Sequence, residues 1–533
     1  MKRLRNARKP LGDIPPWKLY PLFFAVVYFS HLTLLRLPYF WDEAGYYIPA
    51  AWDFYRTGSL IPQTTLTNAH PPLPSILLAA WWHLSGFVPS GTRTLVCMVS
   101  AAALLGVFKL ARSLCTRSVA AVTAILTAIY PIWFAQSTLA HADIFAAAFT
   151  LWAFAFYLEP EPASSTRNQI SVAFLFSLAA LSKETAIVTP VALALWETFL
   201  LIRSSRAIPR REHTRWIIAL LIPILPLAAW YAYHYHATGF IFGNPQFLRY
   251  NATANLGLHR IALSLWHRLL HLTVHMNLYV AVICAAAALF IPATPESPKG
   301  LQKPALQAIA VIFIANWIAF SILGGALLTR YLLPVYPLII LLCVTTWHRH
   351  LRRWWLLAAL TAAAFLSGIW IYPPYPFAPE DNLAYRDMVV LHVEAVHIIE
   401  HRYPKAIVLT AWPATSELAR PELGYTRTPI KTVAIDNFSF GEIEKAAADP
   451  GSYDTALIFS TKIDPRGINL ARANRASDAK YFDYHQDLDP TEVAALLHGN
   501  IVWQAHRNAE WAAILRFPRI VNASLTPLSL PLR

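Results

Sequence analysis

The chain has little charge for its length. Only 14% of its 533 residues are Asp, Glu, Lys or Arg, and 56% are hydrophobic, whereas a soluble domain carries about 25% charged residues. Apolar runs near the roughly 20 residues needed to cross a bilayer recur from residue 18 to residue 372. This composition excludes an ordinary soluble domain and predicts a membrane-embedded chain.

Cysteine and nucleotide-binding motifs are also scarce. The four cysteines lie in or beside apolar runs without CxxC spacing, which indicates neither a disulfide framework nor a zinc–thiolate site. The sequence has no P-loop and no GxGxxG motif. The net charge of +14 would suit nucleic acid, but the basic residues sit in short loops between apolar runs, where they orient a membrane protein. We therefore expect no nucleic-acid partner.

The apolar runs predict eleven membrane spans. They cover residues 18–37, 92–110, 118–138, 142–158, 169–183, 185–202, 216–234, 274–293, 305–325, 331–346 and 354–372. The segment 73–88 is left out because it is short, carries His83 and has paired tryptophans suited to the membrane interface. With it lying along the surface, the basic residues of four segments all face the cytoplasm. These segments are the N-terminal tail, the connection near 111–117, residues 203–215 and residues 347–353.

This topology predicts a domain organisation. The N-terminus is cytoplasmic, and the loops 39–91 and 235–273 lie outside, as does everything after residue 373. The proline-rich run 373–379 cannot continue a helix, and beyond it short strand-like runs alternate with helix-like ones near 385–401, 440–448 and 490–499. We predict a transmembrane domain over 1–375 and an extracytoplasmic α/β domain over 376–533. The basic tail and short cytoplasmic loops favour a bacterial inner (plasma) membrane.

Polar residues in or near the spans are the candidate functional groups. An ionisable side chain costs on the order of 2.5–3.5 kcal/mol at a bilayer centre, so each one needs a reason. Each also has a structural interpretation, because acids favour helix N-termini, His before Pro-Pro suits a turn, and long cations extend to the interface. The candidates, all at the predicted outer surface, are Asp42, Glu43, His70, Asp143, Lys183, Glu184, Arg330 and Tyr331.

Their chemistry suggests separate roles. Asp42, with Glu43 beside it, is the candidate catalytic group, because a hydroxyl or amine acceptor needs a base within hydrogen-bond reach. Lys183 and Arg330 suit a phosphate, and Arg matches a phosphate better than any other side chain. His267 and His271 share one helical face at metal-ligand spacing, although amphipathic histidines at an interface are commoner. We therefore assign no metal, while a divalent cation remains compatible with the sequence.

The candidates also fall in motifs with a family resemblance. In chain order the motifs are Trp41-Asp42-Glu43-Ala44 with Tyr47, His70-Pro71-Pro72-Leu73, Asp143, Leu181-Ser182-Lys183-Glu184, and Arg330-Tyr331 followed by Pro334 and Pro337. Together they resemble the GT-C superfamily of polytopic glycosyltransferases. More specifically, they are similar to the bacterial relatives of protein O-mannosyltransferases and to the lipid A aminoarabinose transferase. The resemblance covers about residues 15–372, and residues 376–533 resemble no family that we can name.

The resemblance implies a hexosyl or pentosyl transferase that uses a polyprenyl-phosphate sugar. Transfer would occur on the extracytoplasmic side with inversion, to a lipid, glycan or protein acceptor, with Asp42 as base or acceptor-orienting group. Related sequences often have Lys before the Pro-Pro pair, where this chain has His70, which leaves the phosphate contact to Lys183 or Arg330. One relative uses a glutamate just before this motif as a metal ligand, where this chain has Ala69. We do not predict that metal site.

Three other functions compete with this one. A transporter or flippase of lipid-linked saccharides would carry ionisable groups near the bilayer midplane and interrupted, paired helices. A polysaccharide ligase or polymerase would use a long outer loop rich in Arg and His. The loop 235–273 leaves this alternative open. A membrane anchor for the outer domain would leave the full activity in residues 376–533 alone.

Overall fold

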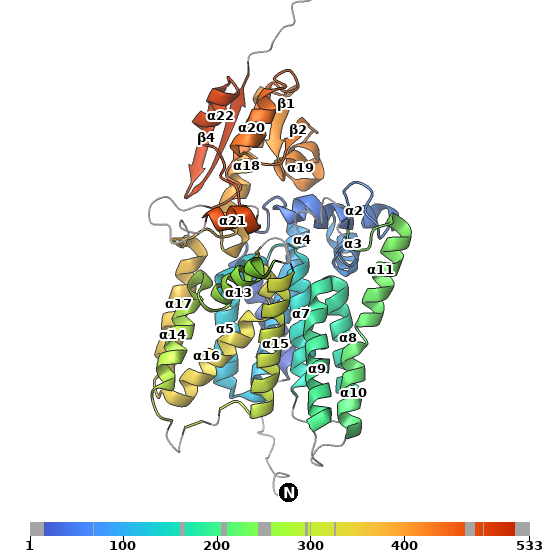
Figure 1. Cartoon of the computed structure of the whole chain (residues 1–533), viewed down its shortest axis with the longest axis vertical. Helices are drawn as coiled ribbons and strands as arrows, with labels where there is room; N and C mark the ends of the chain where they lie inside the picture. The colour runs from blue at the N-terminus through green and yellow to red at the C-terminus, as the bar shows by residue number, and fades with distance from the viewer. Residues whose placement is uncertain are drawn as a thin grey trace, which may run out of the picture. The chain divides into compact units, whose positions relative to one another are not determined.

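The structure is a computed structural model. It describes residues 15–67, 69–159, 166–203, 210–243, 257–293, 297–298, 300–323, 327–463, 475–482 and 484–517. The chain forms two compact units (Figure 1). The helical unit contains Met1–Arg386 and Asp464–Tyr484, and the α/β unit contains Asp387–Ile463 and His485–Arg533.

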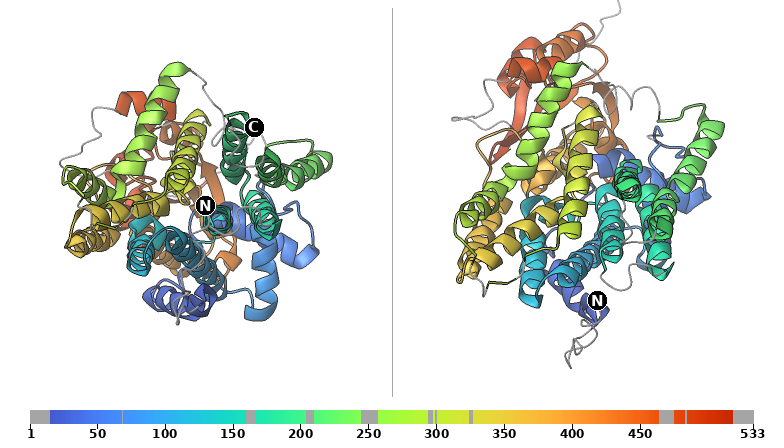
Figure 2. Two further views of the ribbon diagram at one scale, coloured as in Figure 1. Left: turned by 90° about the horizontal axis from the view of Figure 1, so that it is seen from below. Right: turned by 60° about the horizontal axis from the view of Figure 1, so that its bottom comes forward.

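The helical unit is built from long apolar helices packed side by side, which Figure 2 shows from below. Its helices are α1 (Tyr20–Ser30), α2 (Ile48–Thr57), α3 (Leu73–Ser85), α4 (Pro89–Leu114), α5 (Arg117–Ile129), α6 (Pro131–Gln136), α7 (Ala142–Tyr157), α8 (Thr166–Ser182), α9 (Val188–Arg203), α10 (Arg210–Leu221), α11 (Ile224–Thr238), α13 (Leu258–Thr273), α14 (Leu278–Leu289), α15 (Lys303–Ile322), α16 (Tyr336–His350) and α17 (Trp354–Trp370). Its short helices include η2 (Glu43–Tyr47), η3 (Glu184–Ile187), η5 (Thr329–Leu332) and η6 (Pro379–Asp381).

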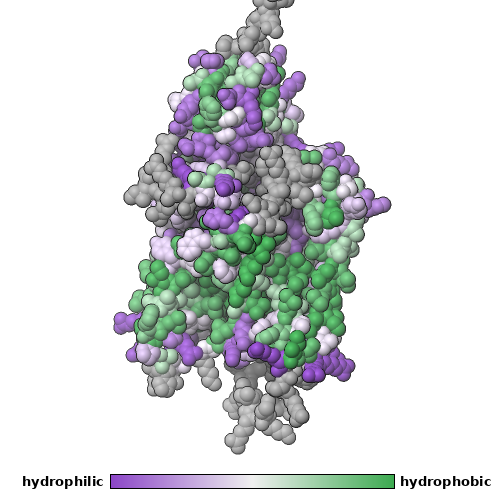
Figure 3. Space-filling view, in the orientation of Figure 1, coloured by the Kyte–Doolittle hydropathy of each residue, from purple (hydrophilic) through white to green (hydrophobic). Residues whose placement is uncertain are grey.

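Several of these helices suit a membrane. Five helical stretches in the described part are long and apolar enough to cross one: Pro89–Leu114, Glu184–Arg203, Arg210–Thr238, Leu258–Leu289 and Lys303–Ile322. Hydrophobic side chains cover the outside of the helices in a band (Figure 3). The predicted polytopic helical fold is therefore confirmed, while the count of eleven spans stays a prediction. The segment 73–88, which we did not count as a span, contains α3.

The centre of the helical unit is the pair α4 and α7. Most residues of α7 are buried, and its Ala146, Ala147 and Ala148 are small enough to let neighbouring helices approach closely. Gly106 of α4 is needed for this packing, because a Cβ there would lie 2.9 Å from Cδ1 of Trp152 on α7. This close packing holds α7, which carries Asp143 in its first turn, against α4.

The α/β unit contains one five-stranded sheet in the order β2-β1-β3-β5-β4. Its strands are β1 (Ile407–Ala411), β2 (Lys431–Ile435), β3 (Thr455–Phe459), β4 (Asn500–Arg507) and β5 (Glu510–Arg516). β1 pairs in parallel with β2 and β3, whereas β5 is antiparallel to β3 and β4. Its helices include α19 (Ala414–Ala419), α20 (Phe440–Ala447) and α22 (Pro490–Leu496).

The chain passes between the units within one helix, α18 (Ala384–Arg402), since the unit division falls after Arg386. The small C-terminal sheet domain was predicted, together with helices near 385–401, 440–448 and 490–499. The β4–β5 hairpin was not predicted, although a turn residue, Asn508 with φ of 51°, separates its strands. Residues of β4 alternate between exposed and half-buried, the pattern of a strand with one face toward solvent.

Candidate functional site

Arg330 is the centre of the candidate site. It lies on η5, in the connection before α16, and is only 2% exposed. Its Nη2 donates to Asp42, its Nη1 donates to Glu380 at 2.5 Å, and its Nε lies 3.4 Å from Oδ2 of Asp143. The guanidinium fork suits several carboxylates at once. One cation therefore joins three acids from distant parts of the helical unit.

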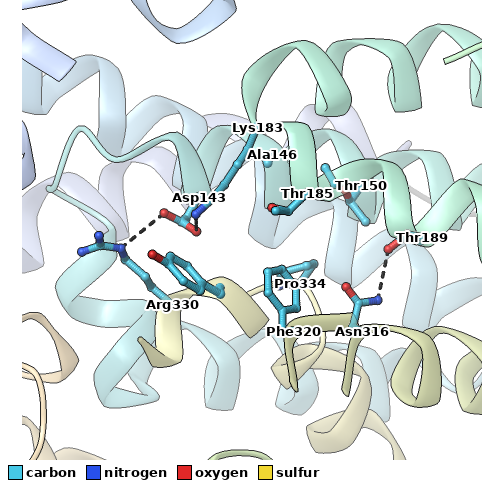
Figure 4. Close-up of a pocket in the computed structure, with 12 residues that line it drawn as sticks. Asp143, Ala146, Thr150, Lys183, Thr185, Thr189, Asn316, Phe320, Arg330 and Pro334 are labelled. Carbon is cyan, nitrogen blue, oxygen red and sulfur yellow. Dashed lines mark hydrogen bonds and ion pairs between the residues drawn. The ribbon is translucent and has the colours of Figure 1, made fainter. Parts of the chain in front are cut away.

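Lys183 is the second cation of this cluster. It directly follows α8, and its Nζ donates to Oδ1 of Asp143 at 2.6 Å. The same ammonium lies 3.9 Å from the ring centroid of Tyr331. Asp143 thus lies between Lys183 and Arg330, as Figure 4 shows. The structure brings five predicted candidates together here: Asp42, Asp143, Lys183, Arg330 and Tyr331.

His70 and Glu184 form a neighbouring pair. Nδ1 of His70 lies 2.8 Å from Oε2 of Glu184, and both side chains are partly exposed. The ring of Tyr47 stacks on His70 at 5.8 Å and tilts against His141 at 5.9 Å. Since Glu184 follows Lys183 in sequence, this pair borders the Arg330 cluster and remains more open to solvent.

Glu43 is the predicted candidate that the structure places elsewhere. Its carboxylate is fully buried and pairs with Arg93 of α4 at 3.2 Å. It also accepts the backbone N–H groups of Phe40 at 2.8 Å and Ala140 at 2.7 Å. Burial raises the pKa of the Glu43 carboxyl, and Arg93 opposes that shift. Each carboxylate oxygen of Glu43 thus accepts a hydrogen bond from a backbone N–H group, and Glu43 does not join the Arg330 cluster.

Two acids of the site were missed from the sequence. Glu380 and Asp381 lie on η6, beyond the proline-rich run, and the unit division keeps them with the helices. Asp381 accepts from Thr329 and pairs with Nε2 of His275 at 2.8 Å. Burial raises the pKa of Glu380 to about 7, and Arg330 opposes this shift. An acidic pair directly after the last predicted span was the available signal.

The cluster has more acids than bases. Asp42, Asp143 and Glu380 face Arg330 and Lys183, so their formal charge sums to −1 when all are ionised and to zero when Glu380 is protonated. The cavity beside Asp143, Lys183 and Arg330 has a volume of about 20 Å³, room for one water-sized group. The side chains face one another across it (Figure 4). An incoming phosphate must therefore separate some of these ion pairs.

The two histidines considered for a metal have different partners. Nε2 of His267 lies 3.7 Å from Oδ1 of Asp478, whereas the ring of His271 packs on that of His275 at 5.2 Å. Within the described ranges, no three His, Cys, Asp or Glu side chains are arranged to hold a metal ion. The need for a divalent cation stays untested.

The chain is similar to known proteins in part of its sequence and in its fold. Residues 69–230 match the family model of dolichyl-phosphate-mannose-protein mannosyltransferases. No curated protein matches the sequence. The fold is similar to that of ArnT from Cupriavidus metallidurans bound to undecaprenyl phosphate, with 14% identity, coverage of 94% of this chain and 97% of ArnT, and a TM-score of 0.55. For apo ArnT the identity is 14%, the coverage 94% and 98%, and the TM-score 0.57.

A weaker likeness links the chain to the archaeal oligosaccharyltransferase AglB from Archaeoglobus fulgidus, in complex with an inhibitory peptide and a dolichol-phosphate. The two are 11% identical, with coverage of 93% of this chain and 74% of AglB and a TM-score of 0.48.

The fold is that of a polytopic helical protein with helices suited to a membrane, and residues 69–230 of it match a mannosyltransferase family model. The family-model match over residues 69–230 agrees with the family resemblance that the motifs predicted. The fold resembles that of ArnT over nearly the whole of both chains.

Proposed function

We propose that the protein transfers a hexosyl or pentosyl group from a polyprenyl-phosphate sugar to a hydroxyl or amine acceptor, with inversion. One observation carries this proposal: two buried cations, Arg330 and Lys183, share Asp143 beside a more exposed carboxylate, Asp42. The undecaprenyl phosphate bound to ArnT supports a lipid-phosphate ligand. The family matched by residues 69–230 is named for a dolichyl-phosphate donor, which supports the same ligand class.

Asp42 is the proposed general base. Its side chain is 20% exposed, whereas those of Asp143 and Glu380 on the same guanidinium are 2% and 5% exposed. It is therefore the carboxylate that an acceptor reaches most easily. In the reaction the acceptor loses its proton to Asp42 and attacks the anomeric carbon from the face opposite the phosphate. The bond from that carbon to the phosphate oxygen breaks, and polyprenyl phosphate leaves with the electron pair.

Arg330 and Lys183 are proposed to bind that phosphate. Negative charge grows on the leaving oxygen as the bond breaks, and preorganised cations in a water-poor site stabilise such charge strongly. His70, held by Glu184, borders the donor, and Tyr331 packs against both cations. Glu43 is proposed to act indirectly, by fixing the backbone beside Asp42. The chemistry requires no cofactor, and a divalent cation remains an option for the phosphate.

The proposed face of the membrane follows from the ends of the helices. Helices α4, α9 and α16 end, and α5, α10 and α17 begin, at one end of the helical unit, whereas α7 begins at the other (Figure 1). The first of these ends contains the basic residues that orient membrane proteins. We therefore propose a cytoplasmic N-terminus, a site on the extracytoplasmic face of a bacterial inner membrane, and an extracytoplasmic C-terminal domain over 376–533 that selects the lipid, glycan or protein acceptor.

The test is release of polyprenyl phosphate by purified protein reconstituted in lipid. Wild type is compared with Asp42→Asn, which keeps the side-chain shape but removes the base. Asp449→Asn, at an exposed position of the α/β unit, is the matched control. We expect release by wild type and the control, and loss in a folded Asp42→Asn protein. Donor binding without release by wild type would contradict the proposal and favour a transporter.

A further inference from the structure

A second feature of the helical unit lies away from the Arg330 cluster. Helices α8 and α10 pack side by side, and the groove between them has a volume of about 560 Å³. Apolar side chains form most of its lining: Ile170, Ala173 and Phe174 of α8, Ile218 and Ala219 of α10, and Ile222 just after α10. Ile170, Phe174 and Ile218 are each more than half exposed. The groove is thus open on the hydrophobic outside of the unit.

One end of this groove is basic. α8 begins at Thr166 and α10 at Arg210, both at the same end of the unit (Figure 1), and helix N-termini carry partial positive charge. Arg215 and Thr166 line the groove there, and Arg167, Arg210 and Arg211 lie in the first turns of the two helices. The acids nearby in sequence are Glu212, also on α10, Glu159, which pairs with Lys109 at 3.2 Å, and Glu161, which lies outside the described residues. Positive charge prevails at this end.

Gln169 adds an independent sign of a ligand. Its side chain lines the same basic end of the groove and is only 6% exposed. Its Nε2 has no hydrogen-bond partner among the described residues. A buried donor without an acceptor is costly, and a phosphate or ester oxygen in the groove would accept from it.

We propose that this groove binds one anionic phospholipid. The phosphate lies near Arg215 and Gln169, and an acyl chain follows Ile170, Phe174 and Ile222 toward the membrane interior. The occupant is a bilayer lipid because the groove opens on the lipid-facing side, and it is anionic because arginines and two helix N-termini meet at its end.

The proposed lipid site is separate from the sugar-transfer site. α8 has 17 residues, which makes it about 25 Å long. The groove's polar end lies at the start of this helix, whereas Lys183 follows its end. The lipid proposal therefore stands even if the proposed transfer reaction fails.

The experiment is native mass spectrometry of the full chain released from detergent micelles. Phosphatidylglycerol and phosphatidylcholine of equal chain length are added separately, and their affinities are compared in wild type, Arg215→Gln, Gln169→Leu and Arg353→Gln. Arg353→Gln is the control, because it removes the same charge at an exposed position before α17. We expect one phosphatidylglycerol to bind wild type at least about tenfold more tightly than phosphatidylcholine, since charge-assisted hydrogen bonds are the strong ones.

The variants separate this site from general charge attraction. Arg215→Gln should remove most of the preference for phosphatidylglycerol, and Gln169→Leu should weaken binding severalfold, while Arg353→Gln keeps wild-type affinity. Equal binding of the two lipids in wild type would overturn the proposal. An equal loss in Arg353→Gln and Arg215→Gln would also overturn it, as would displacement of the lipid by an equimolar amount of undecaprenyl phosphate.

Discussion

Asp42 and Glu43 are neighbours in sequence, yet their side chains join two different buried arginines. Glu43 and Arg93 form a closed site, in which backbone N–H groups use both carboxylate oxygens. Asp42 and Arg330 form a site with an excess of acids and a partly exposed carboxylate. Satisfied hydrogen bonds make the first pair a fixed part of the fold, whereas the second is suited to exchanging partners. Residue type alone does not distinguish these roles.

The largest expected effects come from replacing the two buried arginines, Arg330 and Arg93. Arg330→Gln removes the cation that Asp42, Asp143 and Glu380 share, and we expect turnover to fall by at least about 10²–10³ because phosphate stabilisation is lost. Arg93→Gln leaves Glu43 buried without its partner, which costs about 3–5 kcal/mol. Turnover assays and thermal unfolding in lipid measure both effects. A folded, active Arg330→Gln protein would contradict the proposed role of that arginine.

Substitutions of Asp42 and Glu43 should separate an effect on activity from an effect on stability. Asp42→Asn should reduce kcat by about 10²–10⁴ without unfolding the protein, because a general base contributes that much. Glu43→Gln should lower the unfolding temperature, and the protein that remains folded should keep its KM for the donor. Circular dichroism on heating and steady-state kinetics separate these outcomes. If Glu43→Gln were as stable as wild type and inactive, Glu43 would belong to the chemistry.

A smaller effect should appear in the pH dependence of donor binding. The pKa of Glu380 in the folded protein is about 7, raised from 4.5 by burial. Below pH 7 the group is protonated, and the cluster holds one negative charge fewer. The KM for a polyprenyl-phosphate sugar, a diester whose charge is constant here, should therefore rise about tenfold from pH 6 to pH 8. Glu380→Gln should flatten this profile.

Stability should follow the same titration. A carboxyl whose folded pKa is raised stabilises the fold fully below its unfolded pKa, and that contribution is lost as the pH rises through the folded pKa. Because of Glu380, the free energy of unfolding should therefore fall as the pH rises from about 4.5 to about 7. The exposed Glu444→Gln is the matched control. If the pH dependence of the donor KM were the same in Glu380→Gln as in wild type, this acid would be excluded from donor binding.

The smallest effect is expected at His70. Its pair with Glu184 is partly exposed, and such ion pairs contribute about 0–1 kcal/mol. His70→Gln should raise the KM for the donor severalfold and leave kcat nearly unchanged. A collapse of kcat instead would move His70 from the border of the donor site to its centre.

The sequence predicted the elements of the fold better than the contacts of the site. Long apolar runs specify helices directly, and the ends of those runs located Asp143, Lys183 and Arg330 before any contact was known. Which acid faces which arginine depends on three-dimensional packing, so the separation of Asp42 from Glu43 could not be read from their adjacent positions. Glu380 and Asp381 were missed because the proline-rich run suggested a domain boundary before them.

The excess of acids around Arg330 has a consequence for the end of each catalytic cycle. In the proposed reaction, polyprenyl phosphate remains as a strongly charged product on Arg330 and Lys183 when the sugar has moved. Asp42, Asp143 and Glu380 compete with it for the same two cations, and the small cavity leaves little room for both. We therefore expect the carboxylates to displace the spent lipid from the two cations and to shorten its residence time. A chase of labelled polyprenyl phosphate from Glu380→Gln should accordingly be slower than from wild type.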